Sequence, residues 1–231
     1  MEQKENSASK NIVETKPLLA FETSQNVCGV CIYFSDENYF SSQINLRHSH
    51  SEMIFEIAES LFKLANIEAG DLDSIVVSEG PGSFTGLRIG FSAAKGIAYG
   101  ANLPIIKVPT YEALAFQLIP LMKENDEFIV SNKVNKDEVY FSKFQIRGNN
   151  YIFAEELTIL PNEHFIKKSD GIKIFGNSAS LFNVKLLMPS VPDPLFIAKW
   201  AIRFGMDKKI FNYDFLEPNY LKEFIVKEKS K

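Results

Sequence analysis

The sequence predicts an α/β protein with two lobes, each a mixed sheet flanked by helices. Over the first half of the chain, apolar runs and turn signals alternate in the order strand, strand, strand, helix, strand, helix, strand. The first three strands read as a meander, and the later ones, separated by helices, indicate helical crossovers. The second half again passes from strands to a helix, and 231 residues with 45% hydrophobic content are enough for such a core.

The first lobe is predicted to cover residues 17–109. Polar and turn-forming side chains at 22–25 and 36–38 separate its first three strands. The expected elements, in chain order, are strands at 17–23, 27–34 and 39–46, a helix at 50–65, a strand at 75–78, a helix at 84–99 and a strand at 104–108.

The second lobe is predicted to cover residues 110–222. Thr110 is expected to cap a helix at 111–122, and the Arg-Gly-Asn-Asn sequence at 147–150 is typical of a hairpin turn. The other expected elements are strands at 128–130, 139–146, 151–160 and 173–176 and a helix at 194–204. We expect residues 1–16 to be a disordered extension and residues 223–231 a flexible tail, because both are polar and charged.

Composition argues against several classes of protein. The net charge of −4, from 25 basic and 29 acidic residues, argues against a protein that holds nucleic acid alone, since neutralising phosphates needs a basic face. No apolar run approaches the ~20 residues that span a bilayer. Residues 1–16 lack the apolar centre of a signal peptide, so we expect a cytoplasmic protein.

Cys28 and Cys31 invite a redox or zinc interpretation. They lie three residues apart on a predicted strand, which sends the two thiols to opposite faces. No second pair of Cys or His completes a zinc site. The favoured interpretation is a pair of buried strand cysteines.

Small residues recur at every fourth position of the helix at 84–99 and just before it. They are Gly82, Gly86, Gly90, Ala94 and Ala98, and together they form a smooth ridge into which a second helix can sink. Glycine costs about 1 kcal/mol inside a helix relative to alanine, so close packing must recover that cost.

The helices at 50–65 and 84–99 also carry more apolar surface than one sheet can cover. We expect the excess to be a docking face for another protein chain, and burial under the second lobe is the alternative. The residues expected at this interface are His50, Met53, Ile54, Ile57, Leu61, Phe84, Gly86, Leu87, Arg88, Gly90 and Ala94. Arg88 is expected to anchor the partner, unless it pairs internally with Glu79 or Glu52.

The glycines that precede the second helix do not make a nucleotide fingerprint. The third glycine of the dinucleotide motif is displaced by one residue, no acidic residue closes the following strand, and the P-loop spacing is absent. Free amides at the start of a helix can still receive a phosphate, so Gly82, Ser83 and Thr85 are candidate contacts for an anion or nucleotide.

Candidates for catalysis and metal binding are scarce. Ser24 and Ser83 have no evident base partner, so no catalytic residue is expected. His48 and His50 form a His-x-His pair, and His164 stands alone. A capping or interface role for His50 is favoured over metal binding, and no metal site is expected.

The segment Gly80-Pro-Gly-Ser-Phe-Thr-Gly-Leu-Arg-Ile-Gly90 resembles the signature of the bacterial TsaB (YeaZ) family. Weaker resemblances follow in the segments at 137–140, 175–179 and 217–222. Two segments depart from the family pattern: Glu22-Thr23-Ser24 stands where relatives read Asp-Thr-Ser, and residues 132–134 replace Asp-Ala-Arg. The longer carboxylate of Glu22 suits a structural turn better than a magnesium site.

The resemblance implies an actin-like ATPase (ribonuclease-H-like) fold and a role in making threonylcarbamoyladenosine on tRNA. TsaB proteins are non-catalytic partners of the TsaD enzyme, so the implied partners are a TsaD-type transferase, a TsaE-type ATPase and a second copy of the chain. Transfer RNA is implied only through the complex, and no cofactor is expected, with ATP and metal in the partner subunits. The alternatives are an actin-like nucleotide-hydrolysing enzyme and a residual glycoprotease-like peptidase.

Overall fold

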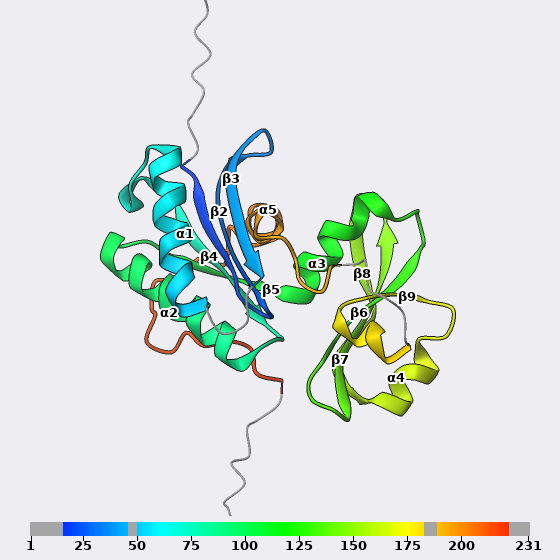
Figure 1. Ribbon diagram of the computed structural model, residues 1–231. Coiled ribbons are helices and arrows are strands. Elements are labelled where there is room, and N and C mark those ends of the chain that lie inside the picture. The colour runs from blue at the N-terminus through cyan, green and yellow to red at the C-terminus, as the bar shows by residue number, and fades with distance from the viewer. Residues whose placement is uncertain (1–15, 46–49, 183–188, 222–231) are drawn as a thin grey trace, which may run out of the picture.

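The computed structural model describes residues 16–45, 50–182 and 189–221 (Figure 1). The extension at 1–15, the tail at 223–231, His48 and the last residue of the strand predicted at 39–46 lie outside this part. Two mixed sheets stand beside each other, each with helices against its faces (Figure 1). The predicted fold class, a two-lobed α/β protein with mixed sheets flanked by helices, is confirmed.

The first sheet has five strands in the order β3-β2-β1-β4-β5. β1 pairs antiparallel with β2 and parallel with β4, which reproduces the predicted meander followed by crossovers. Its strands are β1 (Leu18–Glu22), β2 (Val27–Ser35), β3 (Asn38–Asn45), β4 (Ser74–Gly80) and β5 (Ile105–Pro109).

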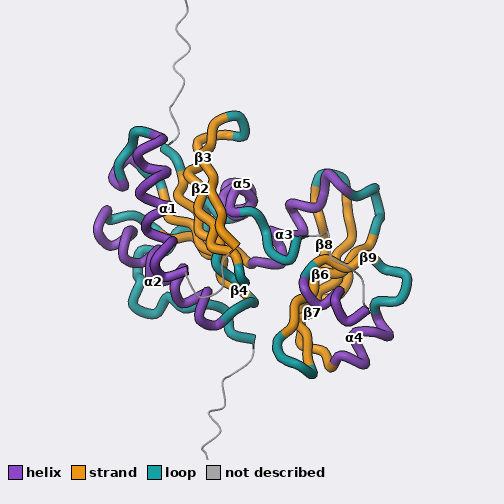
Figure 2. Tube along the Cα trace, viewed as in Figure 1, coloured by secondary structure: helices purple, strands orange, loops and turns teal. Residues whose placement is uncertain are grey.

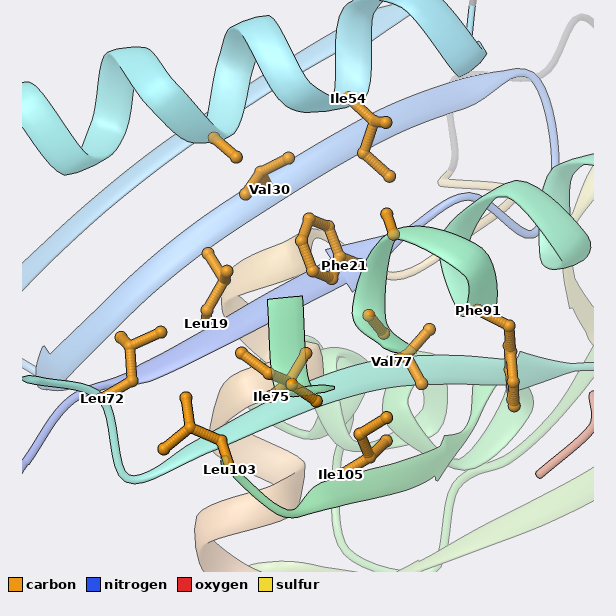
Figure 3. Close-up of a cluster of buried hydrophobic side chains, with 14 of the residues drawn as sticks. Leu19, Phe21, Val30, Ile54, Leu72, Ile75, Val77, Phe91, Leu103 and Ile105 are labelled. Carbon is orange, nitrogen blue, oxygen red and sulfur yellow. The ribbon is translucent and has the colours of Figure 1, made fainter. Parts of the chain in front are cut away.

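Helices cover both faces of this sheet. α1 (His50–Ala65) and α2 (Phe84–Ala101) pack on the face that carries Leu19 and Phe21, as Figure 3 shows. α5 (Pro194–Phe204) packs on the opposite face, which carries Leu18 and Ala20. β1 is therefore buried along its whole length, because alternate side chains of a strand enter opposite cores.

The second sheet has the order β8-β7-β6-β9. α3 (Thr110–Leu118) packs on one face and α4 (Asn162–Lys168) on the other. Its strands are β6 (Glu127–Lys133), β7 (Glu138–Arg147), β8 (Asn150–Pro161) and β9 (Lys173–Phe175), and short 3-10 helices occupy Ala69–Asp71, Ile119–Leu121 and Asn177–Phe182.

The division into residues 17–109 and 110–222 is too simple. After the second sheet the chain returns, so that α5 lies against the first sheet (Figure 2). Ile210 then pairs with Ile105 at the edge strand β5, and Leu216 enters the core beneath α1 and α2. The C-terminal segment therefore completes the first lobe.

Two local predictions need correction. Thr110 does not cap α3; it is the first residue of the helix, and its Oγ1 accepts a hydrogen bond from the Gly80 N–H at 3.0 Å, which ties α3 to the end of β4. The short helix α4 was not expected from the sequence.

The cysteine prediction is confirmed, because Cys28 and Cys31 lie in different cores, and burial raises the pKa of their thiols to about 11 and about 12.

In the described residues, no helix combines the length and apolar content needed to cross a membrane.

Candidate functional site

The start of α2 is fixed by the turn that follows β1. The Ser83 N–H donates to the Ser24 carbonyl at 2.6 Å, and Ser83 Oγ accepts from the Gly86 N–H at 3.2 Å as the helix cap. A Cβ at Gly82 would overlap Ser24, and one at Gly86 or Gly90 would overlap the carbonyl or the hydroxyl of Thr23. Glycine is therefore required where α2 crosses this turn.

The small-residue ridge consequently faces the chain's own interior. Seven of the residues expected at a partner interface are buried in this chain: Ile54, Ile57, Leu61, Gly86, Leu87, Gly90 and Ala94. They pack the two helices onto the sheet and its turn, which corrects the expectation that they contact another chain. The close approach that the glycines allow is made to Thr23 and Ser24.

The outer side of α1 and α2 remains open. Of the expected interface residues, Arg88 is exposed, Met53 and Phe84 are half-buried, and the side chain of His50 lies outside the described part. Three large apolar side chains join them: Phe55 is 53% exposed, Leu64 66% and Tyr99 81%. The sequence predicted more apolar surface on α1 than one sheet can cover, but nothing in it separated outward side chains such as Phe55 and Leu64 from the inward ones.

The second lobe does not cover these helices. It lies on the other side of the first sheet, beyond α3 and α5 (Figure 1). The alternative prediction, burial of the α1–α2 surface under the second lobe, is therefore wrong for the described residues.

Two hollows run between α1 and α2 and share Phe55. The first, of about 400 Å³, is lined by Phe55, Phe84, Thr85, Arg88, Ile89, Ser92 and Ala93. The second, of about 960 Å³, lies toward the ends of both helices, where its lining includes Phe62, Lys63, Ile67 and Ile97. We call the helices' outer surface with these hollows the α1–α2 face.

Arg88 stands at the edge of this face between two aromatic rings. Its guanidinium carbon lies 3.9 Å from the centre of the Phe84 ring, and its Nε donates to the Tyr220 hydroxyl at 3.2 Å. The predicted alternative, an internal ion pair, is wrong for the described residues: Glu79 pairs with Lys107 at 2.8 Å, and neither Glu79 nor Glu52 pairs with Arg88.

Glu22 ends β1 in a fully buried position. Its Oε1 accepts from the Ser24 N–H at 2.6 Å and from the Ser24 hydroxyl at 2.5 Å. Among the described residues, Glu22 Oε2, Thr23 Oγ1 and Ser78 Oγ have no hydrogen-bond partner. Burial raises the pKa of Glu22 to about 7, although the hydrogen bonds from Ser24 act in the opposite direction.

The candidate anion contacts lie beside this buried acid. The three lie together at the start of α2, where Gly82 and Ser83 are half-buried and Thr85 is exposed. However, the Ser24 carbonyl already accepts the Ser83 N–H, and Ser83 Oγ accepts the Gly86 N–H. The chain's own groups therefore use part of the donor set that an anion would need.

Ligands for a metal are not gathered anywhere in the described part of the chain, where no three His, Cys, Asp or Glu side chains are suitably grouped. His164 is exposed on α4.

Comparison with known proteins places this architecture in a family. A family model described as TsaD, tRNA N6-adenosine threonylcarbamoyltransferase, matches residues 38–187. The chain belongs to this family. Within it, the matched relatives place the chain with the TsaB (YeaZ) proteins, as the resemblance predicts.

Curated relatives called tRNA threonylcarbamoyladenosine biosynthesis protein TsaB align with part of the chain. The protein from Haemophilus influenzae is 29% identical over 126 residues, which cover 54% of this chain and 52% of that protein. The protein from Escherichia coli is 27% identical over 140 residues, covering 60% and 59%. The chain thus spans about half the length of the curated relatives it matches.

A solved structure extends the likeness to the whole fold. YeaZ from Pseudomonas aeruginosa superposes with a TM-score of 0.73 at 22% identity, and the match covers 90% of this chain and 100% of that one. At this identity the match shows the fold. The two-lobed α/β fold with mixed sheets is thus shared with that protein.

Proposed function

We propose that this chain serves the formation of threonylcarbamoyladenosine on tRNA as a non-catalytic partner that binds and activates a TsaD-type transferase. The observation that carries the proposal is the open α1–α2 face in a member of this family. Family membership supports a role in forming threonylcarbamoyladenosine on tRNA. The open α1–α2 face supports the idea that this role is to bind another protein.

The α1–α2 face has the character of a protein-binding surface. Phe55, Leu64 and Tyr99 expose large apolar side chains, and hollows that can receive side chains of another protein lie between the helices. Large exposed apolar side chains beside such hollows favour an interaction site over a free surface. Each 100 Å² of apolar area that a partner covers contributes roughly 2.5 kcal/mol before the costs of association.

The interior supports assignment of the chemistry to the partner. Active proteins of the actin-like class use an aspartate at the end of the first strand, and Glu22 at this place is buried and directed to Ser24. Ser24, whose hydroxyl donates to that carboxylate, is itself fully buried, so a substrate cannot reach this hydroxyl. We therefore assign ATP and metal to the transferase and a TsaE-type ATPase, and contact with tRNA to the complex.

The same face also suits a second copy of the chain. A two-fold dimer would cover identical patches with each other, so homodimer and heterodimer would compete for the face. We therefore expect the free chain to associate with itself and the working complex to contain the transferase in its place.

Reconstitution with the purified transferase and ATPase of the same organism tests the proposal. We expect tRNA modification to require the chain, and Phe55→Asp to weaken transferase binding by about tenfold or more, which corresponds to about 1.4 kcal/mol. The matched control is Ile166→Asp on α4, because Ile166 is also apolar and half-exposed but lies on the second lobe.

Modification that proceeds equally well without the chain would contradict the proposal, as would equal losses from Phe55→Asp and Ile166→Asp. ATP hydrolysis by the chain alone, lost in Glu22→Gln, would favour the alternative of a nucleotide-hydrolysing enzyme.

A further inference from the structure

The side chain of Arg88 is held from two sides. The Phe84 ring lies 3.9 Å beneath the guanidinium carbon, and the Tyr220 hydroxyl accepts the Nε–H. The two rings also contact each other, with centroids 5.1 Å apart. A cation over an aromatic face and a hydrogen bond at Nε together restrict the rotamers of a long side chain that is otherwise free in solvent.

The C-terminal segment brings Tyr220 to this position. The Asn219 N–H donates to the Glu79 carbonyl at 2.8 Å, and Leu216 is buried in the core beneath α1 and α2. Tyr220 is 132 residues from Arg88 in the sequence, so the contact exists because the chain returns to the first lobe after α5. Tyr220 is a positioning residue for Arg88.

Among the described residues, nothing occupies the two terminal nitrogens of Arg88. The hydrogen bond to the Tyr220 hydroxyl uses Nε, and within the described residues no carboxylate forms an ion pair with the guanidinium. Arg88 is also the single charged residue among the described residues that line the smaller hollow of the α1–α2 face. A fixed guanidinium that offers its two terminal nitrogens presents a planar fork, which matches a carboxylate in a bidentate pair.

We infer that Arg88 is a preformed carboxylate receptor, and that the transferase meets it with an Asp or Glu side chain beside the apolar hollow. This inference rests on the proposed function. A protein carboxylate is favoured over an RNA phosphate because the hollow is lined by Phe55, Phe84, Ile89 and Ala93, whereas phosphate binding needs several basic groups together. Prior immobilisation of the guanidinium lowers the entropy cost of binding.

Four variants and the purified transferase test the inference in binding titrations. We expect Arg88→Ala to weaken binding by about tenfold or more, and Arg88→Lys to weaken it by about fivefold because the fork is lost while the charge remains. Tyr220→Phe keeps the ring but removes the acceptor, so a loss of about threefold is expected, with Tm unchanged. Lys95→Ala is the matched control, since Lys95 lies on the same helix but does not line the smaller hollow.

Carbodiimide cross-linking of the Arg88→Lys complex identifies the acid. The reagent joins an amine to a carboxylate in direct contact, so the new amine at position 88 should form an amide with one Asp or Glu of the transferase. Mass spectrometry of the cross-linked peptides locates that residue, and its own change to Asn or Gln should then cause no further loss in the Arg88→Ala background.

Several results would overturn the inference while leaving the proposed function intact. One is that Arg88→Ala binds the transferase as tightly as the parent does. Another is that Arg88→Ala and Lys95→Ala lose the same amount of transferase affinity. A third is that Arg88→Ala keeps its transferase affinity and only the retention of tRNA by the complex falls. If the parent chain itself fails to bind the transferase, the proposed function fails as well.

Discussion

The two helical layers on the first sheet differ in what covers them. α1 and α2 on one face expose Phe55, Leu64 and Tyr99, whereas α5 on the other face buries Trp200 between the sheet and the second lobe. Both layers consist of apolar helices, so hydrophobic content alone does not distinguish them. The difference comes from the return of the chain, which places the second lobe over one layer and leaves the other open.

The covered layer is also closed by polar contacts. The Trp200 Nε1–H donates to the Tyr151 hydroxyl at 2.8 Å, and that hydroxyl donates to Glu112 at 2.8 Å. Burial raises the pKa of Glu112, and the Tyr151 hydroxyl lowers it in part. These two hydrogen bonds join α5, β8 and α3, so they fix the second lobe against the first.

The largest contrast should come from removing one aromatic side chain from each layer. Trp200→Ala is expected to lower the free energy of unfolding by about 3–5 kcal/mol, because it leaves a cavity and removes the hydrogen bond that the Tyr151 hydroxyl accepts. Tyr99→Ala should change it by less than about 0.5 kcal/mol, since Tyr99 is 81% exposed. Urea denaturation of both variants measures the contrast, and similar losses in the two would contradict the account.

The interior acid offers a second test through pH. Alternation along β1 puts Glu22 on the same face as Leu18 and Ala20, which is the covered layer. Its pKa is raised from 4.5 to about 7, so in the unfolded chain it ionises at lower pH than in the folded chain. The contribution of Glu22 to stability is therefore complete below about pH 4.5 and is lost as pH rises toward 7.

At about 1.4 kcal/mol per pKa unit, this contribution is on the order of 3 kcal/mol. Denaturation measured at several pH values should show the decline in the parent and a flatter profile in Glu22→Gln, which cannot ionise. An unchanged profile in Glu22→Gln would show that other groups cause the pH dependence.

Two glycines on α2 distinguish the inner and outer sides of the same helix. Gly86→Ala should lower stability by about 1–3 kcal/mol, because the new Cβ meets the Thr23 carbonyl of the chain's own turn. Gly96→Ala should raise stability by up to about 1 kcal/mol, since Gly96 has open space around it and alanine favours the helix. Thermal unfolding of the pair gives the sign of each change, and stabilisation by both would show that the ridge is not tightly packed.

Local pattern was sufficient for most of the fold. The bounds predicted for the helices at 50–65 and 194–204 match α1 and α5, because apolar periodicity and Pro194 at a helix start are local signals. The seven-residue helix α4 was missed, since so short a segment has too few turns to show a period. The meander and the crossovers of the first sheet were predicted, whereas the order of its strands was not.

The candidate site was predicted only in part. The exposed position of Arg88 on α2 agrees with the predicted interface, which stays a prediction, but the glycine ridge that was assigned to a partner faces the chain's own turn. Gly86 packs against Thr23 and Arg88 contacts Tyr220, and both contacts join residues far apart in the chain. Periodicity indicates which sides of a helix are apolar or smooth, but the identity of the covering segment is set by tertiary packing.

The central claim is that the α1–α2 face binds the transferase while the second lobe stays free. Hydroxyl-radical footprinting of the chain, alone and in the purified complex, tests this at the level of side chains. We expect reduced oxidation of Phe55, Leu64 and Tyr99 in the complex, with no change at Ile152 and Ile166, which are half-exposed on the second lobe. Unchanged oxidation of Phe55 and Tyr99 in a complex that demonstrably forms, or protection confined to Ile152 and Ile166, would contradict it.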